Sequence, residues 1–352
     1  MHQGGLTMFS FECDYHEGAH PRILQRLIDI NLEQLPGYGE DEYSARAKQR
    51  IREACGCPEA DVFFFGGGTQ TNVTVIDAIT ETYEGVVSAE TGHVNCHEAG
   101  GVEFTGHKVL TVPNRDGKVA PEDLQALLDT FYRDEAWEHI VFPGALYVSH
   151  PTELGTLYTK AELKALAEIC HKYDMPFFLD GARLGYGLMA DGTDVTLHDI
   201  AEITDVFYIG GTKVGALCGE AVVFPKGNAP KHFFTIMKQR GAVFAKGRVP
   251  AVQFDVLFED GLYYELGKNG IEKAKMIKKV FTDRGFPIYT DSPTNQQFFI
   301  LEDSFADKLR EQVFFETSRR LDENHIVARF CGSWATTDEQ VNKLAEIIDS
   351  LM

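Results

Sequence analysis

The sequence lacks a long hydrophobic run and lacks any cluster of lysine and arginine. No segment approaches the roughly 20 consecutive apolar residues that a membrane-spanning helix needs, so we expect no transmembrane span. The 33 Lys and Arg residues are outnumbered by 53 Asp and Glu residues, which gives a formal net charge of −20 at pH 7. Such a charge repels nucleic acid and anionic membranes unless a local basic patch intervenes. We therefore expect neither nucleic acid nor a membrane among the partners.

Cysteine pairs with the spacing of a metal or redox motif are also absent. The seven cysteines are scattered and odd in number, which favours reduced thiols over a disulfide framework. Cys55 and Cys57 form C-x-C rather than C-x-x-C, and no second cluster accompanies them, so we predict no metal site. The opening stretch "MHQGGLTMFSFECDYHEGAHP" lacks the basic-then-apolar order of a secretory signal, and a cytoplasmic location is the expectation.

The middle of the sequence alternates short apolar runs with amphipathic helical patterns. This alternation favours an α/β fold with a largely parallel sheet. The runs expected to form strands are 61–65, 84–89, 139–149, 175–180, 205–211 and 220–224. Between two of them, Thr159 and Glu162 form a capping box, and apolar residues then recur at helical spacing. A helix is therefore predicted after Thr159.

The length of 352 residues predicts two domains rather than one. From about residue 247 the pattern changes to helix, turn and strands, and a last helix follows a capping box of Thr337 and Gln340. The predicted division has a larger domain (35–246), a smaller α+β domain (247–352) and an N-terminal segment (1–34) that packs with the smaller domain or with a dimer partner.

The strand expected at 61–65 runs into a glycine-rich turn. In an open parallel sheet, ligands bind beyond the carboxyl ends of the strands. Gly66, Gly67 and Gly68 lead into a helix that begins near Thr69. Free backbone N–H groups and the helix dipole there favour a single phosphate. The spacing is not that of a dinucleotide or Walker A loop, and a glycine-rich turn with a threonine cap is the simpler alternative.

A carboxylate, Asp180, ends another apolar run, and Arg183 follows three residues later. A buried carboxylate needs a cationic or hydrogen-bonding partner, and a protonated heteroaromatic nitrogen would serve. Arg183 suits charge-assisted contacts with a phosphate or a carboxylate. The alternative interpretation is that the Asp-Gly pair at 180–181 is an ordinary turn.

A single lysine, Lys213, follows the run "FYIGG", and His93 follows the strand expected at 84–89. The glycines and apolar neighbours of Lys213 would desolvate its amine and favour the neutral, nucleophilic form, whereas the alternative is a surface turn. An imidazole such as that of His93 suits stacking on a flat cofactor ring, although a lone loop histidine is usually structural. A phosphate seat, a strand-end Asp and a glycine-flanked Lys in that order indicate pyridoxal 5'-phosphate bound as a Schiff base.

Several segments resemble the threonine aldolase and β-eliminating lyase group of the fold type I enzymes that use pyridoxal phosphate. The resemblance covers nearly the whole chain and rests on "LPGYGEDEY" (35–43), "GGGTQTN" (66–72), "GHVNCHEAGG" (92–101), "FLDGARLG" (178–185) and "GGTKVGAL" (210–217). It implies a fold type I architecture, with a mostly parallel central sheet in a large domain and a smaller α+β C-terminal domain. It also implies a homodimer or homotetramer that acts on a small amino acid.

The resemblance assigns a role to each residue that matches a motif of this group. Lys213 would carry the Schiff base, and Asp180 would pair with the pyridinium nitrogen. The residues assigned to the rest of the cofactor are Gly68, Thr69 and Arg183 at the phosphate and His93 over the ring.

Two further residues are assigned to the substrate. Arg329, in "HIVARFCGSWAT", would bind the α-carboxylate, a task that suits its bidentate geometry, whereas a surface arginine on an edge strand is the plain alternative. Tyr38 would help to complete the site, partly across a dimer interface.

The sequence departs from the resemblance at two places. Where threonine aldolases usually have Ser-Asp-Thr, this chain has "ECDYHEGAHP", with Cys13 and Asp14 followed by Tyr15 and His16. The resemblance implies that His16 lies near the substrate. Where they commonly carry Asn-x-His, this chain has "SHPTELGT", with Glu153 in place of the histidine and His150 three residues earlier. The base that removes the β-hydroxyl proton is therefore open among His93, Glu153 acting through a water, and His16.

The resulting hypothesis is a lyase that cleaves a small β-hydroxy-α-amino acid, with threonine or allo-threonine giving glycine and acetaldehyde. One alternative keeps the cofactor but changes the bond that breaks, as in an aminotransferase or a β-eliminating lyase for another amino acid. A remote alternative is a non-catalytic binding protein on the same fold.

Overall fold

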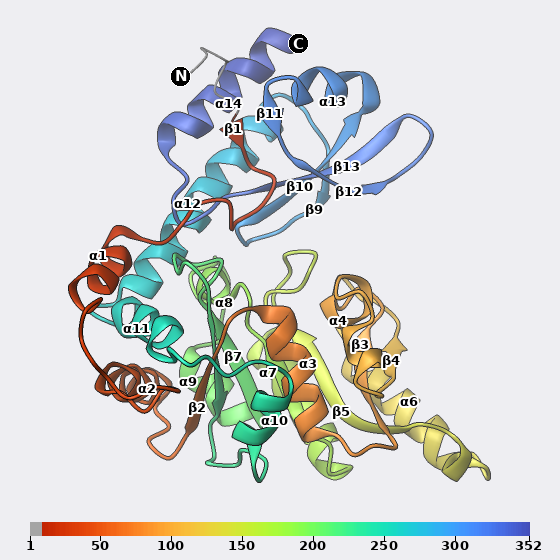
Figure 1. Ribbon diagram of the computed structural model, residues 1–352. Helices are drawn as coiled ribbons and strands as arrows, with labels where there is room; N and C mark the ends of the chain where they lie inside the picture. Colours follow the sequence, from red (N-terminus) through yellow and green to blue (C-terminus); the bar gives the residue numbers. More distant parts are fainter. Residues whose placement is uncertain (1–8) are drawn as a thin grey trace.

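The computed structural model describes residues 9–352, which form a larger and a smaller unit (Figure 1). Helix α12 (Leu262–Thr282) begins beside the larger unit and extends into the smaller one (Figure 1). Among the described residues, none of the helices combines the length and the apolar character that crossing a bilayer requires. All seven cysteines are free.

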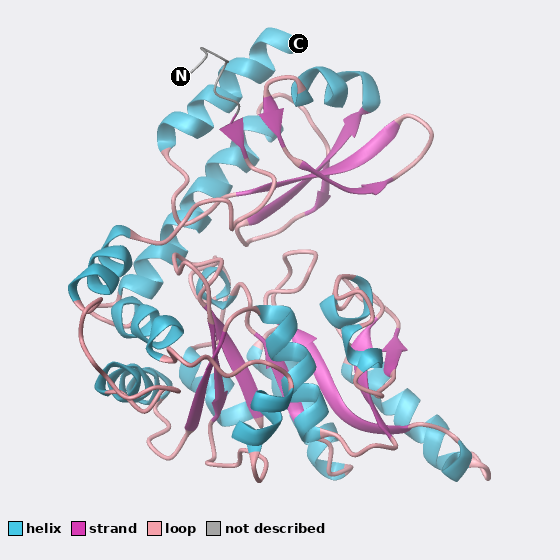
Figure 2. Ribbon diagram, in the orientation of Figure 1, coloured by secondary structure: helices cyan, strands magenta, loops and turns pink. Residues whose placement is uncertain are grey.

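A seven-stranded sheet forms the centre of the larger unit (Figure 2). Its strand order is β2-β8-β7-β6-β5-β3-β4, and β8 alone runs antiparallel to its neighbours. The strands are β2 (Asp61–Phe65), β3 (Glu84–Ala89), β4 (Val109–Val112), β5 (Phe142–Ser149), β6 (Phe177–Asp180), β7 (Val206–Gly210) and β8 (Glu220–Phe224). The α/β prediction with a mostly parallel sheet is therefore confirmed.

Helices cover both faces of this sheet. Phe178 of β6 packs in the apolar cluster of the face that carries α3 and α10, whereas Phe177 and Leu179 pack in the cluster of the opposite face. Because both faces are covered, every residue of β6 and β7 is buried, and the strands read as continuous apolar runs. The helices are α2 (Glu42–Cys55), α3 (Gly68–Ile79), α4 (His93–Cys96), α5 (Gly101–Phe104), α6 (Pro121–Arg133), α7 (Lys160–Lys172), α8 (Leu184–Gly187), α9 (Leu197–Ile203), α10 (Phe233–Gln239) and α11 (Arg248–Leu257), with a 3₁₀ turn η1 (Trp137–His139).

Local capping explains where two of the predicted helices begin. The Thr159 hydroxyl accepts the backbone N–H of Glu162, and the Glu162 carboxylate accepts the N–H of Thr159, so α7 begins with a complete capping box. Thr337 and Gln340 repeat this arrangement at the start of the last helix. Both helix predictions are confirmed.

The smaller unit contains an antiparallel sheet of order β12-β13-β10-β9. Its core includes Phe281 of α12 stacked on Phe299 of β10 with ring centroids 4.1 Å apart. The elements are β9 (Ile288–Thr290), β10 (Gln296–Glu302), α13 (Asp303–Arg310), β11 (Val313–Phe314), β12 (Glu316–Arg320), β13 (His325–Cys331) and α14 (Asp338–Leu351).

The N-terminal segment contacts both units. Strand β1 (Phe9–Ser10) pairs with β11 of the smaller unit, whereas α1 (Pro21–Asp29) packs against α11. Helix α11 packs against α2, and its apolar residues join the core of the larger unit. Residues 1–8 of the predicted segment 1–34 lie outside the described residues, and the limits 1–34, 35–246 and 247–352 stay a prediction.

Candidate active site

The ends of three adjacent strands bring several predicted site residues to one edge of the sheet. Ser149, at the end of β5, pairs with Asp180, at the end of β6. Next to it, the N–H of Gly210 in β7 donates to the carbonyl of Gly181 at 2.9 Å. The segments that carry Glu153, Asp180 and Lys213 therefore leave the sheet side by side, where an α/β sheet places its ligands.

Asp180 is a buried carboxylate with several hydrogen-bond donors. Its Oδ1 accepts the Ala182 N–H at 2.9 Å, and its Oδ2 accepts the Tyr147 hydroxyl at 2.5 Å and Asn72 Nδ2 at 2.9 Å. Burial acts to raise the pKa of Asp180, but the His93 charge and the hydroxyls of Tyr147 and Tyr208 outweigh burial and hold the pKa below its usual value. The group is therefore an anion suited to a buried cationic partner.

The glycine loop before α3 leaves backbone donors free. Gly67 is the N-cap residue of α3, and no side chain caps the helix there. A Cβ built on Gly67 would meet no atom within 4 Å, whereas one on Gly68 would lie 3.2 Å from the Tyr208 hydroxyl. Thr69 is exposed at the same helix start. An uncapped helix N-terminus of this kind can bind an anion such as a phosphate through its free N–H groups.

Lys213 lies three residues beyond the end of β7 and is partly buried. Its Nζ is 5.9 Å from the ring centroid of Tyr15, and within residues 9–352 no ion pair includes this amine. Buried Glu220 fixes the preceding turn, because its carboxylate accepts the Gly211 N–H at 3.0 Å and the Thr212 hydroxyl at 2.7 Å. Buried Glu220 therefore holds the backbone before the lysine, and in the described part of the chain the amine is left without an ion pair.

His93 is the first residue of α4 and is held by a carboxylate. Its Nδ1 lies 2.7 Å from Glu98 Oε1, and its side chain is 27% exposed. Burial acts to lower the pKa of His93, but the contact with Glu98 and the charges of Glu153 and Asp180 together raise it. His93, Glu153 and Asp180 therefore belong to one electrostatic cluster.

His150 is completely buried, unlike His93. Its Nδ1 accepts the backbone N–H of Tyr158 at 3.3 Å, and its Nε2 has no partner among the described residues. Burial lowers the pKa of His150 to about 4.

This burial predicts a loss of stability in mild acid. An unfolded histidine has a pKa of about 6.5, so between pH 6.5 and 4 the unfolded chain binds more protons than the folded one at His150. The unfolding free energy should therefore fall by about 2 kcal/mol between pH 8 and pH 5 through this residue. Urea denaturation of wild type and His150→Asn at both pH values measures the difference, because asparagine can accept the Tyr158 N–H but does not titrate. Equal losses in the two proteins would contradict the prediction.

Arg183 forms an ion pair with the N-terminal segment. Its Nε lies 2.7 Å from Asp14 Oδ2 and its NH2 lies 3.2 Å from Asp14 Oδ1, and Asn295 Nδ2 donates to the same carboxylate at 2.9 Å. The pair lowers the pKa of Asp14 to about 2 although burial opposes this. The described contacts of the guanidinium are thus with Asp14 rather than with the glycine loop, and the phosphate role of Arg183 stays a prediction.

Arg329 lies on β13, in the smaller unit. Its NH1 donates to Gln296 Oε1 at 3.1 Å, its NH2 pairs with Glu316, and its side chain is only 12% exposed. Its buried Nε has no partner among the described residues. The charges of Arg183 and Asp14 act on Arg329, so the two arginines lie near each other.

Tyr38 and His16 are not brought into contact with Lys213 or Asp180. Tyr38 is 50% exposed and lines a pocket of about 90 Å³ together with Phe244. The Phe244 ring packs closely against the glycine loop, because a Cβ built on Gly66 would lie 2.7 Å from it. The Nδ1 of exposed His16 is 2.8 Å from the Ser10 hydroxyl. The substrate roles of Tyr38 and His16 stay predictions.

Sequence reasoning missed the polar residues that support the site. The chief examples are Asn72, Glu98, Tyr147, Tyr208 and Asp14. Asn72 lies on the buried face of α3, and a polar residue at such a position is a signal that could have indicated a buried hydrogen-bond network. The ion pair of Asp14 gave no local signal, because its partner Arg183 is 169 positions away.

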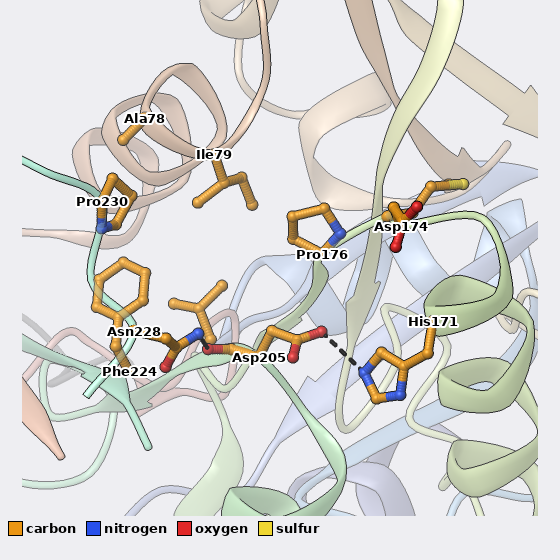
Figure 3. Close-up of a pocket in the computed structure, with 11 residues that line it drawn as sticks. Ala78, Ile79, His171, Asp174, Pro176, Asp205, Phe224, Asn228 and Pro230 are labelled. Atoms are coloured by element: carbon orange, nitrogen blue, oxygen red, sulfur yellow. Dashed lines mark hydrogen bonds and ion pairs between the residues drawn. The ribbon is translucent and has the colours of Figure 1, made fainter. Parts of the chain in front are cut away.

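A pocket of about 520 Å³ lies at the opposite, amino-terminal edge of the sheet (Figure 3). Asp205 forms part of its wall, and its side chain contacts His171 at 3.3 Å (Figure 3). The same carboxylate accepts the Phe177 N–H at 2.9 Å and pairs with Lys226 at 3.0 Å. This carboxylate ties β6 and β7 together where the strands begin. The pocket includes none of the predicted site residues.

Fold and site together define an α/β enzyme of fold type I. The sequence profile of the family described as β-eliminating lyase matches residues 18–304. The chain belongs to this family, whose members are lyases that depend on pyridoxal phosphate.

Similar proteins and solved structures support the same family. The chain is 28% identical over 351 residues to the low specificity L-threonine aldolase of a Pseudomonas species, with 97% of each chain covered. The structure of a Leishmania major threonine aldolase is similar with a TM-score of 0.94 and 38% identity, over 97% of this chain and 99% of that one. An aspartate aminotransferase of Thermus thermophilus shares the fold at 15% identity, with a TM-score of 0.71 over 99% of this chain and 92% of its own.

Proposed function

We propose that this protein binds pyridoxal phosphate and cleaves threonine or allo-threonine to glycine and acetaldehyde. The observation that carries the proposal is the buried, ionised Asp180 at the edge of the sheet where Lys213 and the uncapped start of α3 also lie. The names of the relatives support the choice of substrate.

The proposed cofactor site uses the residues assigned from the sequence. Lys213 would hold the aldehyde carbon, and Asp180 would pair with the ring nitrogen. The other contacts would come from Gly68, Thr69 and Arg183 at the phosphate and from His93 at the ring face. When bound, pyridoxal phosphate supplies the electron sink for cleavage at the substrate Cα.

The proposed reaction needs one bond broken and two protons moved. The Cα–Cβ bond of the substrate breaks, the β-hydroxyl proton passes to a base, and Cα takes up a proton, so glycine and acetaldehyde account for every atom without an oxidant. His93 and Glu153 are favoured as the base over His16, because their charges interact beside Asp180 whereas His16 contacts Ser10. Arg329 would bind the substrate α-carboxylate.

We also propose that the protein is a homodimer or homotetramer in which Tyr38 helps to complete the site of the partner. Tyr38 is half-exposed and contacts neither Lys213 nor Asp180 of its own chain, which supports this arrangement. Sedimentation analysis measures the oligomeric state, and a monomer that is fully active would contradict the proposal.

The first experiment supplies the full-length protein with pyridoxal phosphate and then with L-threonine or L-allo-threonine. Acetaldehyde is followed by coupling to an alcohol dehydrogenase, and glycine is measured in the same samples. We expect equal amounts of both products without any keto acid. If the protein instead transfers the amino group only when a keto acid is added, the aminotransferase alternative is correct and the aldolase proposal is wrong.

A further inference from the structure

Glu98 is a buried carboxylate that lies beside the site and contacts His93. It follows α4 in the turn before α5, and its side chain is fully buried. Burial raises the pKa of Glu98, while hydrogen bonds from His93 and Asn72 oppose this effect. A carboxylate is rarely buried so completely unless its charge has a specific partner.

One oxygen of Glu98 receives both of its contacts. Oε1 accepts Asn72 Nδ2 at 2.7 Å and lies 2.7 Å from His93 Nδ1, whereas Oε2 is buried without a partner in the described part of the chain. An oxygen that already accepts an amide N–H is a poor site for a proton. The proton between Oε1 and Nδ1 therefore belongs to His93, and Nδ1 is the donor.

The second contact of Asn72 links this pair to the predicted cofactor site. Its Nδ2 donates to Glu98 Oε1 and, at 2.9 Å, to Asp180 Oδ2. One amide group thus fixes the positions of two carboxylates, and Asn72 itself is completely buried on α3. The imidazole orientation at His93 is therefore coupled through rigid groups to Asp180.

We propose that Glu98 is a positioning residue that holds His93 as the Nδ1–H tautomer, so that Nε2 is the nitrogen that takes up and releases protons. The relevance of this tautomer to catalysis rests on the proposed function, but the tautomer itself does not. The groups that face His93 are Glu98, Glu153 and Asp180, together with His97, whose ring centroid is 5.6 Å away.

The test measures the tautomer and the titration of His93 directly by NMR. The full-length protein is labelled with ¹⁵N histidine, the His93 signals are assigned with His93→Asn, and the ring nitrogen shifts are followed against pH with and without pyridoxal phosphate. In wild type we expect a protonated Nδ1 and a titrating Nε2. In Glu98→Gln we expect the His93 titration to move to lower pH by about one unit or more, because a carboxylate partner favours the imidazolium form.

Two further variants separate this role from a general effect on the fold. Glu103→Gln makes the same chemical change on α5, at a residue that makes no contact with His93, and should leave the titration unchanged. Glu98→Asp keeps the charge and should restore part of the shift. A neutral His93 that carries its proton on Nε2 in wild type, or a titration that is the same in Glu98→Gln, would overturn the proposal.

Kinetics then connect the tautomer to the reaction. In Glu98→Gln we expect kcat for threonine cleavage to fall about tenfold or more while KM changes less than about threefold, with the acid limb of the rate profile moving to lower pH. If wild type does not cleave threonine, the proposed function is wrong, but the NMR result still decides the role of Glu98.

Discussion

Replacing Lys213 by alanine should abolish threonine cleavage, with a loss of at least about 10⁴-fold, and should remove the absorbance band of bound pyridoxal phosphate. The reason is that Lys213 follows β7 into the site on a turn fixed by Glu220, so its substitution removes the amine proposed to carry the Schiff base. Absorbance spectra and acetaldehyde release measure the two effects. Stability should change little, because Lys213 makes no ion pair within residues 9–352.

Lys226→Ala is a matched control for this variant. Lys226 pairs with Asp205 at 3.0 Å, at the amino-terminal edge of the sheet, so this substitution removes a lysine without touching the site. We expect its spectrum and activity to match those of wild type. If Lys213→Ala keeps the absorbance band and the activity, Lys213 does not bind the cofactor.

Replacing Asp14 by alanine should lower the unfolding free energy by about 3–5 kcal/mol. Both members of the Asp14–Arg183 pair are buried, so the variant leaves the Arg183 guanidinium without its counter-ion in a dry environment. Asn295 also loses its acceptor. Urea denaturation of the cofactor-free proteins measures the loss, and comparison with the cofactor-loaded proteins shows how much ligand binding restores.

Asp303→Ala provides the matched control. Asp303 pairs with Arg320 at 2.9 Å on the surface of the smaller unit, where water screens both charges. Its removal should lower the unfolding free energy far less than the removal of Asp14 does. A similar loss in Asp14→Ala and Asp303→Ala would show that burial of the Arg183 pair contributes nothing to stability.

Most strands of the larger unit could be predicted, because strands that are buried on both faces appear in the sequence as short continuous apolar runs. The runs at 61–65, 84–89 and 220–224 have the observed bounds of β2, β3 and β8. Strand β4 was missed because "VLTV" has only four residues, and two of them are not buried. Capping boxes act within four residues, so the starts of α7 and α14 could also be found from sequence alone.

The candidate site could be predicted only where it follows from strand order. Asp180 ends β6 and Lys213 closely follows the neighbouring strand β7, so the general geometry of parallel sheets is enough to expect them on one edge. The hydrogen bonds of Asn72 depend on how α3 packs over β6, and this packing cannot be predicted from the residues near Asn72 in the sequence. The same is true of Arg183, whose guanidinium was assigned to a phosphate without knowledge of Asp14.

The pairing of β1 with β11 joins the N-terminal segment to a strand that is synthesised about 300 residues later. Asp14, four residues beyond the end of β1, accepts a hydrogen bond from Asn295, which is synthesised 281 residues later. The central sheet can assemble while translation continues, because all of its strands lie between Asp61 and Phe224. Asn295, which donates to the Asp14 carboxylate beside Arg183, is added only with the C-terminal part of the chain. The site is therefore completed in the last stage of folding, through contacts whose long chain separation makes them slow to form.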